Sequence, residues 1–269
     1  RGYLKKQNEK YVIMTDSNVA VNFDFNDLLH AHMASGADAT VVYRKQEIPD
    51  SLIRKSTETV DMYYALGING DHVSKIYVNP TEKGKMNFCL NIYVMERERL
   101  IRMIDDAYVH GYTNFVRDIL ERQIEHLDVR GYCYDGYVAQ IHDMKSYFEE
   151  NMKLLQEENL NALFSGNQIY TKIRDDNPTR YINGSKAKNI MVADGCVIEG
   201  EVENSVLFRG VRIGKGAKVK NCVLMQDTVV EDNASVEYVI TDKDVTITEG
   251  KSLTGNDSFQ VFVAKGQTV

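Results

Sequence analysis

A carboxylate follows directly after a strand-like segment near the start of the chain. The apolar run Tyr11–Met14 leads into Thr15-Asp16-Ser17-Asn18. Carboxylate oxygens are hard ligands of the kind that bind Mg²⁺ in phosphoryl-transfer sites. Asp, Ser and Asn are also the residues that most often hydrogen-bond the backbone of a turn. The residues by themselves favour the second role for Asp16, a turn carboxylate at the end of the strand.

The cysteines and histidines point away from a zinc site and from nucleophilic catalysis. The four cysteines show no C-x-x-C spacing, which favours a reducing compartment. Cys89 lies in an apolar run and is typical of a small buried residue rather than a nucleophile. His142, beside Asp143 at a predicted helix start, is typical of a surface residue.

Charge and hydropathy exclude two further classes of function. Lys plus Arg total 32 and Asp plus Glu total 39, so the net charge is −7. A nucleic-acid-binding protein would carry a basic surplus. No apolar run approaches the ~20 residues that span a bilayer, and no signal-peptide pattern opens the sequence. We expect a cytoplasmic protein that binds neither nucleic acid nor membrane.

Strands and helices are predicted to alternate up to about residue 155. Capping residues followed by apolar residues at helical spacing predict helices after Asn26, Thr113 and Asp143. Runs rich in Val, Ile, Tyr and Phe predict strands at Ala39–Tyr43, Met62–Ile68, Phe88–Met95 and Val129–Tyr134. This alternation indicates an α/β domain over residues 1–155. The polar segment 156–186 is predicted to be a linker.

An internal repeat occupies the last part of the chain, residues 187–269. Asn204-Ser-Val-Leu-Phe recurs seventeen residues later as Asn221-Cys-Val-Leu-Met, and Asn189 precedes Asn204 by fifteen. A period of this size with buried aliphatic positions indicates a parallel β-helix, whose coils complete one another's core. The side chains predicted to face the interior are Ile213, Val219, Val230, Val236 and Ile247.

Motifs along the chain resemble the bacterial glucose-1-phosphate adenylyltransferases. The run Ser35–Thr40 is similar to their S-G-A-D-V-T, Asn91–Val94 to part of their S-M-G-I-Y-V-F strand, and Ser146–Met152 to their Y-x-x-A-N-M. The resemblance implies a Rossmann-like nucleotidyltransferase domain over 1–155 and a left-handed β-helix over 187–269. The family's G-G-x-G-x-R-L nucleotide loop is absent from this sequence, so the first domain is expected to be N-terminally incomplete.

The resemblance also implies where Mg²⁺ would bind, and the sequence departs from the family there. The family's first aspartate falls at Ser17 or Asn18, depending on the direction of counting, and its second falls at Gln140. Neither position carries charge. Asp16 is a candidate substitute, although a shift of one residue along a strand turns a side chain to the other face. We expect no bound cofactor, although the family uses Mg²⁺.

The sugar-phosphate pocket implied by the resemblance is altered as well. Asn79 stands where the family has a lysine, and Cys89-Leu90-Asn91 stands where it has a serine followed by Met-Gly. Asn79 lacks the positive charge that a phosphate dianion favours. With both metal positions and both pocket positions replaced, the sequence resembles the non-catalytic subunits of bacterial glycogen-synthesis systems.

We therefore expect a regulatory subunit that contacts a catalytic glucose-1-phosphate adenylyltransferase chain or further copies of itself. A sugar phosphate or a nucleotide is a candidate effector. One alternative is an active adenylyltransferase in which Asp16 replaces the lost ligand. Another is a hexapeptide-repeat acyltransferase, a class that commonly uses a histidine base. All six histidines precede the repeat region, which disfavours this last alternative.

The segment Ser258–Ala264 is the last strand-like run. Alternation places Phe259, Val261 and Val263 on one face and Phe262 on the other. The run is predicted either to cap its own β-helix or to contact another subunit.

Overall fold

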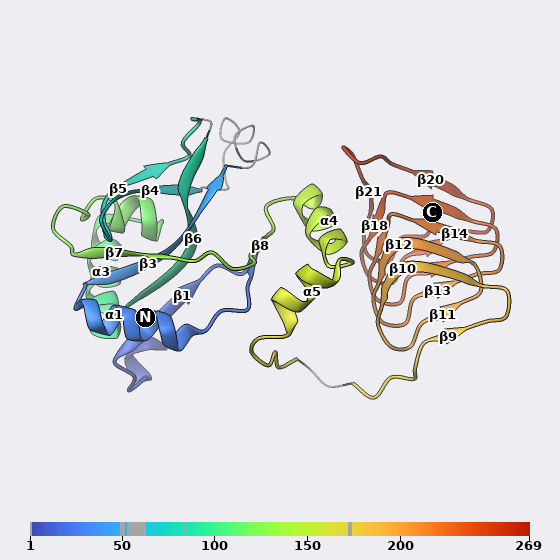
Figure 1. Ribbon diagram of the computed structural model, residues 1–269, viewed down its shortest axis with the longest axis horizontal. Coiled ribbons are helices and arrows are strands. Elements are labelled where there is room, and N and C mark those ends of the chain that lie inside the picture. The colour runs from blue at the N-terminus through green and yellow to red at the C-terminus, as the bar shows by residue number, and fades with distance from the viewer. Residues whose placement is uncertain (1, 49–51, 53–62, 83, 172–173) are drawn as a thin grey trace. The chain divides into compact units, whose positions relative to one another are not determined.

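The structure is a computed structural model that describes residues 2–48, 52, 63–82, 84–171 and 174–269. The chain forms two compact units, Arg1–Gly136 and Tyr137–Val269. Figure 1 shows the first in blue to green and the second from green to red. No helix in the described ranges combines the length and apolar composition that crossing a membrane requires.

The first unit is built on a mixed six-stranded sheet of order β1-β6-β3-β7-β5-β4. The neighbours β3 and β7 run parallel, and the other neighbouring pairs run antiparallel. The strands are β1 (Tyr11–Thr15), β3 (Ala39–Glu47), β4 (Tyr64–Asn69), β5 (His72–Val78), β6 (Lys85–Glu96) and β7 (Val129–Cys133), with the short β2 (Val19–Ala20) after β1. Met62, the predicted start of one strand, lies outside the described residues.

Helix α1 (Phe25–Ser35) of the first unit has a capping residue at each end. It is capped at its start by Asp24, whose carboxylate accepts a hydrogen bond from the backbone N of Asn26. It ends at Gly36, whose φ of 64° favours glycine. The cap therefore lies two residues before the predicted Asn26. Helix α3 (Arg97–His110), which the sequence analysis does not predict, follows β6 directly.

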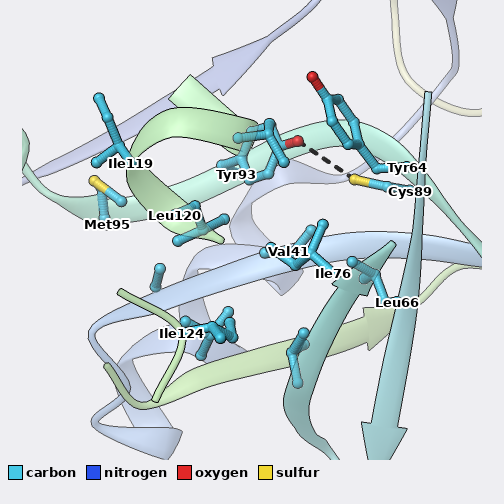
Figure 2. Packing of buried hydrophobic residues seen from close by; sticks show 14 of the residues in the cluster. Val41, Tyr64, Leu66, Ile76, Cys89, Tyr93, Met95, Ile119, Leu120 and Ile124 are labelled. Atoms are coloured by element: carbon cyan, nitrogen blue, oxygen red, sulfur yellow. Dashed lines mark hydrogen bonds between the residues drawn. The ribbon is translucent and has the colours of Figure 1, made fainter. Parts of the chain in front are cut away.

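The next helical segment is a single π-helical stretch, Phe115–Leu120, capped by the side chain of Asn114. The sequence analysis places the cap at Thr113, one residue earlier. A 3-10 turn, Leu4–Lys6, precedes β1. The core of this unit joins the sheet to α3 and the π-helix. Figure 2 shows part of it, with Val41 and Met95 from the sheet and Leu120 from the π-helix.

The second unit opens with β8 (Ala139–Gln140) and two helices. Helix α4 (Met144–Lys153) begins at Asp143 as predicted, and Ser146 completes a capping box. The segment 156–186, predicted to be a linker, contains helix α5 (Glu157–Phe164) and the short strand β9 (Arg180–Tyr181).

A parallel β-helix follows, which confirms the predicted repeat fold. One sheet contains β20-β17-β14-β12-β15-β18-β21 with β10 beside β12, and another contains β19-β16-β13-β11-β9. The strands are β10 (Lys186–Val192), β11 (Val197–Ile198), β12 (Glu201–Leu207), β13 (Arg212–Ile213), β14 (Lys218–Lys220), β15 (Val223–Leu224), β16 (Val229–Val230), β17 (Ser235–Glu237), β18 (Val239–Thr241), β19 (Thr246–Ile247), β20 (Ser252–Thr254) and β21 (Val261–Val263).

The coils stack in the register that the repeat predicts. Val219 pairs with Val202 and with Val236, seventeen residues away in each direction. The five side chains predicted to face the interior are all buried, with at most 2% of their surface exposed. The paired strand β9 extends the ladder N-terminal to residue 187. Its exposed Arg180 and Tyr181 lack the aliphatic signal that marks the later coils.

The last run folds back onto its own β-helix. Strand β21 pairs in parallel with β18, and Val263 is buried. Phe259 and Phe262 remain 69% and 48% exposed. Self-capping, one of the two predicted outcomes, is therefore present, and two aromatic rings are left on the surface.

Candidate functional site

Two of the residues singled out in the sequence meet at the end of an edge strand. Asp16 follows β1 directly, and β1 lies antiparallel beside β6, with Thr15 opposite Ile92. The Nδ2 atom of Asn91 donates a hydrogen bond to Oδ2 of Asp16 over 2.6 Å. The sheet thus brings Asp16 to Asn91, one of the residues of the expected sugar-phosphate pocket.

A bulge in β6 gives Asn91 this orientation. Val42 of β3 pairs with Ile92, whereas the next residue, Tyr43, pairs with Cys89, so Leu90 and Asn91 are additional residues on β6. Asn91 has a φ of 55°, a left-handed conformation that asparagine tolerates better than most residues. The similar family strand has glycine here, which fits the same backbone requirement. Bulges of this kind re-aim side chains.

Behind Asn91 lies a buried network of sulfur and hydroxyl groups. The Tyr93 hydroxyl donates to Oδ1 of Asn91 over 2.9 Å and lies 3.4 Å from Sγ of Cys89. The backbone N of Asn91 also donates to that sulfur. Figure 2 shows the Cys89–Tyr93 contact with the ring of Tyr64 beside it. The Asn91 amide is therefore bound on both sides within the protein.

Burial keeps the thiol and the hydroxyl of this network protonated. It raises the pKa of the Cys89 thiol to about 11 and also raises the pKa of the Tyr93 hydroxyl. At neutral pH both groups are protonated, and a thiol is a poor nucleophile compared with a thiolate. The ring of Tyr93 packs edge-on against Phe115, with ring centroids 5.4 Å apart. These contacts fix the side chains around Asn91, and neither the Cys89 thiol nor the Tyr93 hydroxyl is ionised at neutral pH.

Asn79 performs a local backbone role at the end of β5. Its backbone N donates to the carbonyl of Tyr63, and its Oδ1 accepts from the Tyr63 backbone N, both over 2.9 Å. Its φ of 48° again lies in the left-handed region. The side-chain oxygen of Asn79 is thus committed to tying the chain ahead of β4 to the strand end.

Tyr64 and Asn114 belong to the same neighbourhood and were not singled out from the sequence. The Tyr64 hydroxyl donates to Oδ1 of Asn114, which also accepts from the backbone N of Arg117. Burial raises the pKa of the Tyr64 hydroxyl. Only the N-cap signal of Asn114 before an apolar stretch could have been found in the sequence.

The predicted metal positions differ in their surroundings. Ser17 and Asn18 form the turn between β1 and β2, and Ser17 is exposed. The Oδ1 atom of Asn18 is buried and has no hydrogen-bond partner among the described residues. Gln140 belongs to β8 of the second unit. The pairing of Ser17 with Gln140 stays a prediction.

The donors gathered near Asp16 do not fit a resident Mg²⁺ ion. Asp16 supplies one carboxylate, which already accepts the Asn91 hydrogen bond, and its neighbours Ser17 and Asn18 offer neutral oxygens. Protein Mg²⁺ sites rely on carboxylates together with substrate phosphates. Across the described residues, no group of three or more His, Cys, Asp and Glu side chains is arranged to hold a metal ion.

Fold and site together define a class: a nucleotidyltransferase-like α/β unit joined in sequence to a hexapeptide-type β-helix. Residues 173–260 match the family model described as GlmU-like, C-terminal hexapeptide. Over 265 residues the chain is 30% identical to the glycogen biosynthesis protein GlgD of Bacillus subtilis (strain 168). The matched region covers 98% of this chain and 65% of the relative.

Two relatives from Geobacillus stearothermophilus each cover 81% of the chain. Its glucose-1-phosphate adenylyltransferase is 30% identical over 55% of its own length, and its glycogen biosynthesis protein GlgD is 32% identical over 51%. The chain thus spans about half to two thirds of the length of these curated relatives. Over most of its length it is similar to the glucose-1-phosphate adenylyltransferases and to the GlgD proteins.

Proposed function

We propose that this protein is a regulatory, non-catalytic subunit of a cytoplasmic glucose-1-phosphate adenylyltransferase of glycogen biosynthesis. The reaction of the assembly would join ATP and glucose 1-phosphate to give ADP-glucose and pyrophosphate. Similarity to proteins named for glycogen biosynthesis supports the pathway. Similarity to adenylyltransferases supports a catalytic chain, or a second copy of this chain, as the partner.

The observation that carries the non-catalytic assignment is the internal hydrogen bonding of the altered pocket. Asn91 is held between Asp16 and Tyr93. Positioning and neutralisation of phosphate charge supply most of the catalysis in phosphoryl transfer. A pocket whose polar groups are satisfied by one another, and whose lysine and serine positions are Asn79 and Cys89, is poorly equipped for either task.

The test is to assay ADP-glucose formation by this protein alone, by the catalytic chain alone and by the two together. We expect no product from this protein alone and a changed activity of the catalytic chain in its presence. The double variant Ser17→Asp/Gln140→Asp should bind Mg²⁺ more tightly than the wild type. Mg²⁺-dependent product from the wild-type protein alone would overturn the proposal.

An active enzyme is the second candidate, because the Asp16 carboxylate does reach the altered pocket. In that case Asp16→Asn, which keeps the size of the side chain and removes its charge, would abolish product formation by this protein. Under the regulatory proposal, Asp16→Asn leaves the activity of the mixed assembly unchanged. One pair of assays therefore separates the two candidates.

A further inference from the structure

A groove of about 430 Å³ lies in the second unit between helix α4 and one corner of the β-helix. Its apolar wall is made by Phe148 and Met152 of α4, by Leu155 and by Tyr238 of the corner. Its polar lining comes from Asn189, Asn204 and Asn221 of the corner and from Glu149, Lys153, Gln156 and Asp257. Ligand sites commonly combine a largely apolar surface with a few convergent polar groups.

The corner itself is a column of residues in the left-handed conformation, one from each coil. Asn189, Asn204 and Asn221 have φ values of 50°, 45° and 50°, and Tyr238 continues the column at 52°. Asparagine suits this conformation, whereas a tyrosine there costs conformational energy. The ring of Tyr238 lies 6.1 Å from that of Phe148. An aromatic surface thus interrupts the amide column where α4 packs.

Several hydrogen-bonding groups of the groove are left open within the described part of the chain. Oδ1 of Asn204 accepts from Nδ2 of Asn189 over 2.8 Å, which leaves the Asn204 Nδ2 without a partner. The Asn221 side chain has no hydrogen bond to another described residue, and Gln156 uses only its Oε1, toward Asn159. The groove therefore presents amide donors and acceptors toward its open space.

The charges of the groove disfavour an anionic ligand. Glu149 and Asp257 contribute carboxylates, and the one lysine of the lining, Lys153, lies 2.6 Å from Oε1 of Glu150. A phosphate would meet the carboxylate of Asp257, that of Glu149, which lies 3.6 Å from the Nζ of Lys145, and a lysine that is already paired. A hydroxyl group both donates and accepts, so it can use carboxylates and amides alike.

We infer that this groove binds a neutral saccharide, with its hydroxyls on the amides and carboxylates and one face of a sugar ring on Tyr238. The choice of an α-1,4-linked glucose oligomer as the saccharide rests on the proposed function. Binding to the β-helix would let the subunit respond to the polymer to which the pathway leads.

The test is calorimetric titration of the full chain with maltotetraose, cellotetraose and glucose 6-phosphate. We expect maltotetraose to bind, and Tyr238→Asn to weaken it at least tenfold without lowering Tm, because asparagine suits the corner conformation. The matched control is Tyr181→Asn, which removes an exposed tyrosine of β9 outside the groove and should leave binding unchanged.

Three results would overturn the inference: no binding of either tetrasaccharide, stronger binding of glucose 6-phosphate, or unchanged maltotetraose binding by Tyr238→Asn. Binding of cellotetraose alone would overturn the α-glucan assignment. The same preparations are assayed with the catalytic chain. If no saccharide binds but the activity of the catalytic chain still changes, only the inference about the groove is contradicted. If the activity of the catalytic chain does not change at all, the proposed function is contradicted.

Discussion

The side chain of Asn91 lies between Asp16, 75 positions earlier in the sequence, and Tyr93, two positions later. It reaches both because a bulge turns it out of the regular alternation of β6. The contacts among Asp16, Cys89 and Tyr93 are therefore organised around an amide in a left-handed backbone conformation.

This arrangement predicts an unusual order of stability at position 91. Both Asn91→Gly and Asn91→Ala lose the hydrogen bonds to Asp16 and Tyr93. Alanine adds the strain of a positive φ, so Asn91→Ala should be less stable than Asn91→Gly by about 1 kcal/mol in urea unfolding. At Asn87 of the same strand, which has no positive φ, the order should reverse because glycine weakens a strand. The same order at both positions would contradict the role of the bulge.

The four cysteines should differ sharply in reactivity. Cys133 is exposed, and Cys89, Cys196 and Cys222 are buried. With a pKa of about 11, roughly one Cys89 thiol in 10³ is ionised at pH 8, and burial raises the pKa of Cys222 to about 12. The aromatic disulfide DTNB should titrate one thiol in the native protein and four in denaturant. Cys133→Ser should remove the native reaction, and a second fast thiol would show that one of the three buried cysteines is accessible.

His32 should make stability depend on pH. It is buried, its Nδ1 lies 2.8 Å from Oγ1 of Thr40, and burial lowers the pKa of its imidazole below the usual 6.5. The unfolded chain then binds a proton that the folded chain does not, so stability falls as pH drops below about 6.5, by at most about 1.4 kcal/mol per pH unit. His32→Gln should flatten the difference in unfolding free energy between pH 7.5 and 5.5. An NMR titration in which His32 protonates at or above pH 6.5 would refute this.

The two exposed aromatic rings of the last run, Phe259 before β21 and Phe262 within it, are predicted to contribute to assembly. Because β21 already pairs with β18, replacing Phe259 and Phe262 by serine should leave the β-helix folded. The double variant should associate more weakly with the catalytic chain in sedimentation velocity experiments, since buried apolar area is lost from the contact. Tyr108→Ser, which alters a highly exposed residue of α3, is the control. Unchanged assembly and partner activity would place the interface elsewhere.

Local patterns in the sequence were sufficient for the β-helix and for the N-cap of helix α4. A coil repeats the same contacts every seventeen residues, so the burial of Ile213 and Val230 follows from spacing alone. Asp143 caps α4 through groups within three residues of it. Each of these features depends on neighbours in the sequence or on a strict period.

The surroundings of Asn91 and the groove beside Tyr238 depend on contacts between segments that are distant in the sequence and not related by a repeat. The Asp16–Asn91 hydrogen bond requires the pairing of β1 with β6 and a bulge that moves one side chain. Helix α3 and helix α5, inside the segment 156–186, carry many polar residues. Their apolar faces therefore gave no clear helical period in the sequence. Tyr238 falls at the asparagine corner by register alone, but only the packing of α4 puts Phe148 beside its ring. Tertiary contact between distant segments decided these features, because side-chain position there is set by pairing and packing rather than by local propensity.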